Sequence, residues 1–248
     1  MRDGWIWAFC LPNRQNVNYN KRMGILYIIA TPLGNLKDIT LRALELLKEV
    51  DLVVCEDTRQ TLKLLNHYEI KKPLASYFQH SKLSKIDYIA GQLKSGKNVA
   101  LVTDAGTPGI SDPGGILVNK LANEQVNKIK VVPIPGPCAA VAALSVSGFP
   151  TDRFVFMGFP PHKKGREKYF KEVAVAEHTV VFYESTHRIV KTLEQLIKVL
   201  PQRQIVVCRE LTKIFESVYR GSAEEILNIL NSDKNNLKGE FVIVVNHE

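Results

Sequence analysis

The stretch that most constrains this chain is a long loop rich in glycine and proline, residues 104–115 (DAGTPGISDPGG). An apolar run at 99–102 leads into it, and an apolar helical pattern at 116–121 leads out of it. The glycines permit positive φ angles and expose bare backbone, and the prolines stiffen the loop. Asp104 would stand at the carboxyl end of the strand, where open α/β sheets bind ligands. The alternative is a long turn without chemistry, although loops of this length are uncommon unless they are functional.

The first part of the chain alternates between strand and helix patterns. It begins with Gly24 to Thr31, a continuous apolar run typical of a buried parallel strand. The alternation continues to about Gly148 and predicts a mostly parallel α/β sheet. The expected strands are 24–31, 51–55, 99–102 and 130–134, and the expected helices are 41–50 with Asp38 as its N-cap, 62–68, 83–93 closed by Gly96, 116–121 and 139–146.

The alternation starts again after a stretch with the composition of a linker. Some of the predicted strands in this part are spaced as in β-hairpins, and others are separated by a predicted helix. We therefore expect a smaller sheet that mixes parallel and antiparallel strands. We therefore divide the chain into an N-terminal α/β domain at 23–148, a linker at 149–153 and a C-terminal α/β domain at 154–248. The expected strands of the second domain are 154–159, 179–183, 205–208, 215–220 and 241–245, and its expected helices are 168–175, 189–200 and 222–230, the last opened by a capping box.

Residues 1–22 show no strand or helix periodicity. They also lack the basic start, long apolar centre and small-residue cleavage site of a secretory signal. Met23 stands directly before the first clear strand. We interpret 1–22 as a disordered leader, or as the product of a start codon assigned upstream of the true one.

The cysteines, at positions 10, 55, 138 and 208, are far apart and form no C-x-x-C pair. This spacing argues against a zinc or redox site and fits a reduced, cytoplasmic compartment. No histidine lies at metal-ligand spacing from a cysteine or another histidine, so we expect no metal. No apolar stretch is long enough to cross a membrane, so we expect no membrane partner.

The formal net charge of +8, with a pI near 9.2, suits an acidic partner such as RNA, although many basic proteins bind none. The densest basic run extends from His162 to Arg166. We expect Lys163, Lys164 and Arg166 to contact phosphates, and nearby aromatic residues could stack on bases. A solvated surface loop is the plain alternative.

Four loops are expected at the carboxyl ends of strands in the first sheet: 32–35, 56–59, 104–115 and 135–138. In a parallel sheet these ends lie along one edge, so the loops can surround one cleft. None of them fits G-x-G-x-x-G or G-x-x-x-x-G-K-[ST], which argues against a nicotinamide cofactor or a P-loop nucleotide. The expected ligand is compact, partly apolar and held by backbone groups.

Two charged blocks follow apolar runs, EDTR at 56–59 and ESTHR at 184–188. In the first block, Asp57 could cap a helix and pair with Arg59, or the block could act in catalysis. In the second, Ser185 or Thr186 could cap the next helix, which leaves the two charged ends unexplained. A carboxylate there could accept a proton, and a guanidinium could hold a phosphate or a developing alkoxide. The catalytic candidates are Glu184, Arg59, Glu56 and Arg188.

Eight motifs extend over most of the chain. The first half carries LYIIATPLGNLKDITLRAL at 26–44, CEDTR at 55–59, TDAGTPGISDPG at 103–114 and PGPCA at 135–139. The second half carries FMGFPP at 156–161, YESTHR at 183–188, RELTK at 209–213 and GEFV at 239–242. Together they closely resemble the ribosomal RNA small subunit methyltransferase I family, within the tetrapyrrole methylase superfamily.

The resemblance implies S-adenosylmethionine-dependent 2′-O-methylation of a cytidine ribose in small-subunit (16S) ribosomal RNA. It implies two α/β domains of the tetrapyrrole methylase type, with the cofactor in the interdomain cleft. The implied partners are the small ribosomal subunit or its rRNA and a second copy of the chain in a homodimer. Cys138 stands where relatives often have serine, so a backbone contact is expected there. By motif position, the implied cofactor contacts are Pro32, Leu33, Asp104, Ala105, Gly106, Thr107, Ile110, Cys138 and Ala139, together with Phe182 or Tyr183, Cys208 and Glu240 from the second domain.

Two other functions stay open. One is a methyltransferase acting on a small tetrapyrrole-like substrate, whose carboxylates could also use the basic loop. The other is a non-catalytic RNA-binding module, which would not require the glycine- and proline-rich loops. Binding of the cofactor separates both methyltransferases from the third possibility.

Overall fold

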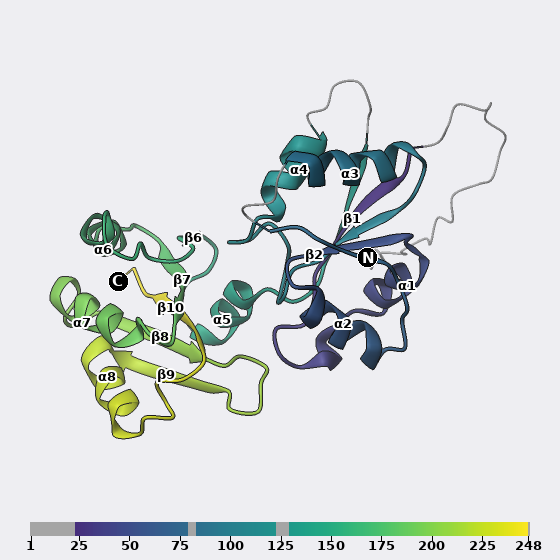
Figure 1. The fold of residues 1–248 in the computed structure, drawn as a ribbon. Helices are drawn as coiled ribbons and strands as arrows, with labels where there is room; N and C mark the ends of the chain where they lie inside the picture. Colours follow the sequence, from purple (N-terminus) through teal and green to yellow (C-terminus); the bar gives the residue numbers. More distant parts are fainter. Residues whose placement is uncertain (1–22, 79–82, 123–128, 248) are drawn as a thin grey trace, which may run out of the picture.

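The computed structural model describes residues 23–78, 83–122 and 129–247. The predicted leader, 1–22, lies outside the described residues. Within them the chain forms two lobes, each built on its own β-sheet (Figure 1).

The first sheet is parallel throughout and has the strand order β3-β2-β4-β1-β5. β2 and β4 are buried along their whole length, because helices cover both faces of a parallel sheet, whereas most residues of the edge strand β5 are partly exposed. One strand, β3, was not predicted: it has three residues and follows a proline, so it lacks the length of a strand pattern. The strands are β1 (Ile25–Ile29), β2 (Leu52–Cys55), β3 (Leu74–Ser76), β4 (Val99–Leu101) and β5 (Lys130–Ile134).

Helices α1 (Leu41–Glu49) and α2 (Thr58–His67) lie on one face of this sheet, and α3 (Leu83–Lys94) and α4 (Gly114–Ala122) lie on the other (Figure 1). Each pair buries an apolar stripe in a separate core layer. The carboxyl ends of the parallel strands meet at one edge of the sheet, as predicted. The four expected loops therefore emerge together at that edge.

The second sheet is mixed, with the order β6-β7-β10-β8-β9. β6 and β7 are parallel, and the remaining pairs are antiparallel. The mixed character was predicted, but the smaller size was not correct, because both sheets have five strands. The strands are β6 (Phe154–Phe156), β7 (Thr179–Ser185), β8 (Gln204–Arg209), β9 (Ser217–Ser222) and β10 (Glu240–Val245).

Helices α6 (Arg166–Ala174), α7 (Ile189–Val199) and α8 (Ala223–Ser232) cover one face of the second sheet. The other face is covered by α5 (Ala139–Ser147), whose buried alanines pack against β7, β8 and β10 (Figure 1). The sequence assigned this helix to the first domain. By packing it belongs to the second lobe, because small side chains allow it to lie close to the sheet. The strands of the first sheet lie between Ile25 and Ile134, and those of the second lie between Phe154 and Val245.

Helix ends correct two of the expected caps. The N-cap of α1 is Thr40, whose hydroxyl accepts from the Ala43 N–H, whereas Asp38 lies in the 3-10 helix η1 (Leu36–Asp38). α7 begins after Arg188 without a side-chain cap, so neither Ser185 nor Thr186 caps it. The predicted capping box of α8 and the left-handed Gly96 after α3 are confirmed.

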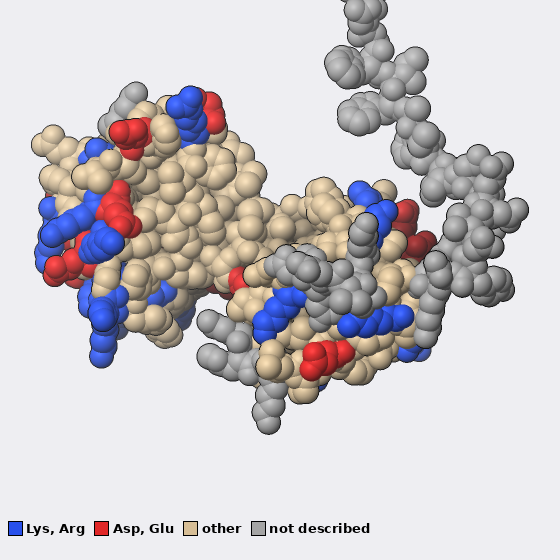
Figure 2. All heavy atoms as spheres, turned by 90° about the horizontal axis from the view of Figure 1, so that it is seen from above, with Lys and Arg blue, Asp and Glu red and all other residues tan. Residues whose placement is uncertain are grey.

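The space-filling view shows two lobes joined by a narrower middle (Figure 2). Lysine and arginine side chains gather at the outer end of the lobe that carries α6, where acidic side chains are mixed with them. The broad face between that end and the middle carries few charges. The positive net charge therefore does not form one continuous basic stripe on this face. No helix in the described part of the chain is long and apolar enough to span a membrane.

Candidate functional site

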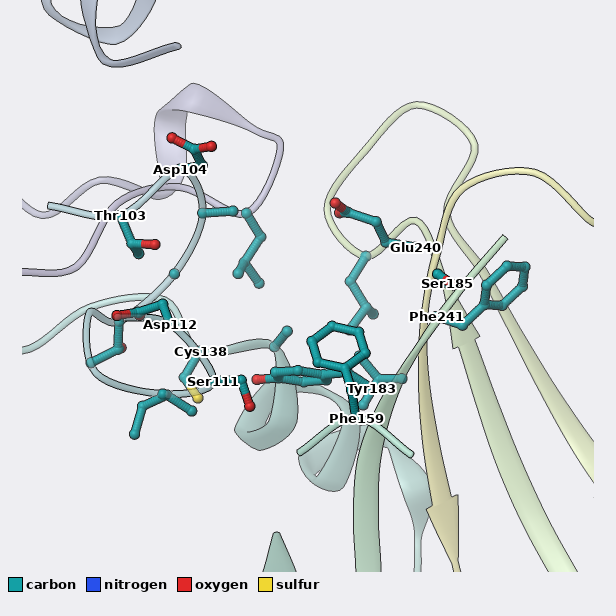
Figure 3. Close-up of a pocket in the computed structure, with 18 of the residues that line it drawn as sticks. Thr103, Asp104, Ser111, Asp112, Cys138, Phe159, Tyr183, Ser185, Glu240 and Phe241 are labelled. Atoms are coloured by element: carbon teal, nitrogen blue, oxygen red, sulfur yellow. The ribbon is translucent and has the colours of Figure 1, made fainter. Parts of the chain in front are cut away.

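A cavity of about 380 Å³ lies between the two lobes, at the edge where the loops of the first sheet meet the second sheet (Figure 3). This volume is in the range of small-molecule sites, about 300–1,000 Å³. The lining residues are Leu33, Glu56, Thr103, Asp104, Ala105, Gly106, Thr107, Ile110, Ser111, Asp112, Cys138 and Ala139 from the first part of the chain, and Phe159, Tyr183, Glu184, Ser185, Leu211, Glu240, Phe241 and Val242 from the second.

The glycine-rich loop after β4 is fastened to two neighbouring loops. Thr31 and Gly106 exchange backbone hydrogen bonds of 2.9 and 3.1 Å. The Thr107 hydroxyl donates to the Pro137 carbonyl at 2.9 Å. Gly106 has a φ of +84°, and a Cβ there would lie 3.2 Å from the Leu33 side chain. A glycine is therefore required where the three loops meet.

The second half of the same loop is organised by Asp112. Its carboxylate accepts from the Gly109 N–H at 2.7 Å and from the Gly114 N–H at 2.7 Å. Gly109 and Ser111 have φ angles of +88° and +63°. Such a conformation is uncommon for serine, and residues held in it cluster at functional sites. The loop is thus a defined wall of the cavity.

Aromatic side chains form the opposite wall. The Phe159 and Tyr183 rings meet edge to face, with centroids 5.4 Å apart (Figure 3). The Tyr183 hydroxyl accepts from the Ala140 N–H at 3.2 Å, next to Cys138. Burial raises the pKa of Tyr183 to about 12, so this wall is neutral at physiological pH. Phe159 is 48% exposed and stands at the opening.

Carboxyl groups dominate the polar part of the wall. Glu56 accepts from the Thr103 hydroxyl at 2.7 Å, and Asp104 accepts from the Asp57 N–H at 3.2 Å. Burial raises the pKa of both carboxyl groups. Asp104 and Glu240 stand on opposite sides of the opening (Figure 3). Among the described lining residues there is no lysine, arginine or histidine, so the cavity favours a ligand that carries positive charge.

A second cavity, of about 480 Å³, adjoins the first. The two cavities share Leu33, Thr103, Asp104, Ala105 and Glu240. The rest of the second wall comes from the loop after β1, the first turns of α2 and one residue after β8: Thr31, Pro32, Gly34, Leu36, Gln60, Thr61, Lys63, Leu64 and Lys213.

The structure gathers most of the expected cofactor contacts in the first cavity. Three lie elsewhere. Pro32 lines only the second cavity, and Phe182 points into the helix-covered core on the other face of β7 from Tyr183. Cys208 is buried beneath α5. Side chains alternate between the two faces of a strand, so Phe182 points away from the cavity that its neighbour Tyr183 lines. Cys208 lies opposite Val242 on the same face as Tyr183, but it does not line either cavity.

Of the four catalytic candidates, Glu56 lines the first cavity with an accessible carboxyl group. The Glu184 side chain is fully buried and forms an ion pair with Arg188, 2.8 Å between Oε1 and Nη2. The carboxylate of Glu184 is therefore enclosed inside the second lobe and does not face the mouth of the cleft. Arg59 is 87% exposed and pairs with Asp57 at 2.7 Å, as the capping interpretation predicted.

The three basic residues that were predicted to contact phosphates have different environments in the structure. Lys163 and Lys164 are exposed before α6. Arg166 is 4% exposed and donates to Thr192 at 2.6 Å and to Gln195 at 2.6 Å. The assignment of Arg166 to an exposed phosphate contact is wrong, because its guanidinium satisfies polar groups inside the lobe.

Several lining residues were not selected from the sequence, although some lie within the quoted motifs. Phe159, Leu211 and the Phe241–Val242 pair approach the cavity from separate strands and loops of the second lobe, and no local spacing indicates this. Ser111 and Asp112 had a usable signal, because they lie in the glycine-rich loop itself. The full set of missed residues is Thr103, Ser111, Asp112, Phe159, Ser185, Leu211, Phe241 and Val242. Within the described residues, no group of three or more acidic, histidine or cysteine side chains could hold a metal ion.

Comparison with solved structures supports the two-lobed fold. Diphthine synthase superimposes with a TM-score of 0.70 at 16% identity, covering 90% of each chain. A cobalt precorrin-4 methyltransferase of cobalamin biosynthesis superimposes with a TM-score of 0.65 at 16% identity, covering 89% of this chain and 94% of that one. At such identities the likeness concerns the fold alone.

Sequence comparison is more specific. The model of the family described as "Tetrapyrrole (Corrin/Porphyrin) Methylases" matches residues 25–227. Proteins named "Ribosomal RNA small subunit methyltransferase I" from Escherichia coli O157:H7 and Bacillus subtilis are 45% and 44% identical, each over 94% of this chain and over 81% and 79% of their own lengths. The one from Haemophilus influenzae is 48% identical over 90% of this chain and 78% of its own. The chain therefore belongs to the tetrapyrrole methylase family and, within it, to the ribosomal RNA small subunit methyltransferase I family.

Proposed function

We propose that this enzyme transfers a methyl group from S-adenosylmethionine to the 2′-hydroxyl of a cytidine ribose in the 16S rRNA of the small ribosomal subunit. The observation that carries the proposal is the acidic, aromatic cavity at the glycine-rich loop, in a chain whose relatives at 44–48% identity are named as rRNA methyltransferases.

The first cavity suits the cofactor by charge and by surface. S-adenosylmethionine carries a sulfonium and an ammonium group, and the described lining residues combine carboxylates with aromatic and aliphatic side chains and include no basic group. Backbone groups of the Asp104–Thr107 segment border the same space. These residues would hold the cofactor against bare backbone.

When bound, the cofactor supplies an electrophilic methyl group: the bond from the ribose oxygen to carbon forms as the carbon–sulfur bond breaks, and S-adenosylhomocysteine remains. The residues of the chain align the two reactants and take up the hydroxyl proton. We assign the proton to Glu56, because its carboxyl group lines the cavity and burial raises its pKa. Arg59, an exposed residue in the first turn of α2, would hold an RNA phosphate.

Methylation of a small tetrapyrrole-like substrate is the weaker alternative. Two solved structures are named for such compounds, a cobalt precorrin-4 methyltransferase and a uroporphyrin-III-C-methyltransferase; they are 16% and 19% identical to this chain, and the likeness concerns the fold alone. The proposed partner is the small ribosomal subunit, the proposed assembly is a homodimer, and the proposed location is the cytoplasm, where ribosomes are modified.

The direct test is transfer of a labelled methyl group to small subunits that lack the modification, followed by nuclease digestion and identification of the product. The expected product is 2′-O-methylcytidine at close to one per subunit. Label in a base, or transfer only to a tetrapyrrole, would contradict the proposal. The same assay on naked rRNA shows whether the assembled subunit is required.

A second test concerns the cofactor alone. Asp104→Ala should weaken S-adenosylmethionine binding about tenfold, because a charged hydrogen bond contributes about 1.5–3 kcal/mol. Calorimetry measures this without RNA. An unchanged dissociation constant in a folded variant would remove Asp104 from the cofactor site.

A further inference from the structure

We propose that the second cavity binds the target nucleotide of the RNA, unstacked from its neighbours, with a phosphate beside Lys63. The inference rests on the proposed function and names the site that this function requires. It concerns the wall formed by the loop after β1 and the first turns of α2.

The first argument is adjacency. The two cavities meet along Leu33, Thr103, Asp104, Ala105 and Glu240. A ligand in the second cavity therefore lies beside a ligand in the first, with no lobe or helix between them. Methyl transfer requires contact between the acceptor oxygen and the methyl carbon, so the acceptor must occupy a space that is continuous with the cofactor site.

The second argument is the difference in charge between the two walls. The first cavity has no basic residue among its described lining residues, whereas the second has Lys63 and Lys213. Lys213 is neutralised, since its ammonium group lies 2.9 Å from Glu210 and 2.8 Å from Glu240. Lys63 donates to the Gln60 amide oxygen at 3.1 Å and makes no ion pair with another described residue. Its charge is available to a phosphate.

The third argument is the chemistry and the size of the second wall. Gln60 and Thr61 offer hydrogen-bonding groups, and Pro32, Leu36 and Leu64 offer apolar surface for a base or a ribose. At about 480 Å³ the cavity can hold a single nucleotide and not a stacked helix. Enzymes that modify a base turn the nucleotide out of its stack, and the same displacement would bring the ribose of one nucleotide into a cavity of this size.

The cavity is closed on one side by a contact between the lobes. The aliphatic chain of Lys213 lies over Gly34, where a Cβ would come within 2.2 Å of it. The Asn35 N–H also donates to the Thr212 hydroxyl at 3.2 Å. Lys37 and Arg59 are exposed, and each adjoins in the chain a residue that lines the second cavity, Leu36 and Gln60 respectively. Under this proposal they would contact the phosphates that flank the unstacked nucleotide.

The decisive variant is Gln60→Trp, which fills the second cavity and leaves the first one unaltered. We expect its dissociation constant for S-adenosylmethionine to stay within about twofold of the parent value, while methyl transfer to small subunits falls by about a hundredfold or more. The matched control is Leu62→Trp, an equally large change at an exposed position of the same helix, outside both cavities. It should keep both properties.

A second variant tests the phosphate contact and does not affect the core. Lys63→Glu should raise KM for small subunits about tenfold, the effect of losing one charged contact, with cofactor affinity unchanged. Lys48→Glu, a charge reversal at an exposed position of α1, is its control.

The outcomes separate the two proposals. If the parent enzyme does not methylate small subunits, the proposed function itself is wrong. If the parent enzyme does so and both Gln60→Trp and Lys63→Glu behave like it, only the nucleotide site is wrong. If Gln60→Trp loses cofactor affinity, the second cavity is part of the cofactor site and the inference is overturned. Should Gln60→Trp fail to fold, Lys63→Glu decides.

Discussion

The Arg188 guanidinium and the Glu184 carboxylate form an ion pair of 2.8 Å inside the second lobe, and the glutamate side chain is fully buried. The Thr192 hydroxyl donates to the second carboxylate oxygen at 2.6 Å. Arg188 also donates to the Pro160 carbonyl at 2.9 Å, and its guanidinium lies 5.9 Å from the centre of the Phe159 ring. The pair therefore connects β7 with the loop that carries one aromatic wall of the first cavity.

We expect Glu184→Gln to lower the free energy of unfolding by about 3–5 kcal/mol, because it leaves buried guanidinium groups without their counter-charge. Urea denaturation measures the change. Glu194→Gln, at an exposed position of α7, is the control and should have little effect. A variant with parental stability and a reduced single-turnover rate would instead return Glu184 to the catalytic candidates.

Phe159→Ala should weaken cofactor binding about tenfold with little loss of stability. The ring is 48% exposed, so its removal leaves the core intact, yet it takes away an aromatic ring that packs on Tyr183 and lines the cavity. Phe154→Ala is the control: Phe154 is 44% exposed and lies outside both cavities. Equal cofactor affinities in the two variants would show that Phe159 does not contact the ligand.

Glu56→Gln should stabilise the free enzyme at neutral pH and reduce methyl transfer. Burial raises the pKa of Glu56 in the folded state above its ordinary value of 4.5, so the folded state binds the proton more tightly than the unfolded state. The parent therefore loses stability as the pH rises from the pKa of Glu56 in the unfolded state to its higher pKa in the folded state, and the glutamine variant does not. The higher stability of the glutamine variant relative to the parent should be present at pH 7 and disappear as the pH falls below about 4.5.

Urea unfolding of the parent and the variant at several pH values measures this difference, in which the titrations common to both cancel. A constant difference at all pH values would contradict the raised pKa. Full methyl transfer by the variant under saturating cofactor would contradict the role of Glu56 as proton acceptor.

The double charge reversal of Lys163 and Lys164 should weaken binding to small subunits and flatten its dependence on salt. The slope should fall by about 0.7 for each lysine that contacts a phosphate, while cofactor affinity stays unchanged. Lys191 and Lys198, both exposed on α7, provide a matched double reversal as a control. An unaltered slope in the test variant would mean that this loop is only a solvated surface. Arg166 is left out, because its reversal would unfold the lobe.

The sequence by itself determined the parallel first sheet, the cleft loops and the family. Buried parallel strands are continuous apolar runs, and each functional loop of the first lobe follows such a run directly. The loop after β4, with Asp104, Gly106 and Thr107, lines the first cavity, and its place was predictable because the carboxyl ends of parallel strands meet at one edge. The N-cap of α2 could also be predicted from the sequence, because the Asp57 carboxylate accepts from the N–H of Arg59, only two positions away.

Only the tertiary structure decided where the second lobe contributes to the site. Glu184 and Arg166 are charged in the sequence, and their burial follows from partners that come from α7 as well as from each other. Likewise, α5 lies on the second sheet because its alanines fit that face, which its position in the chain does not indicate. The two cavities differ in charge because Lys63 and Lys213, which are far apart in the chain, line only the second one. Local pattern fixes what a segment becomes, and packing between distant segments fixes which side chains meet.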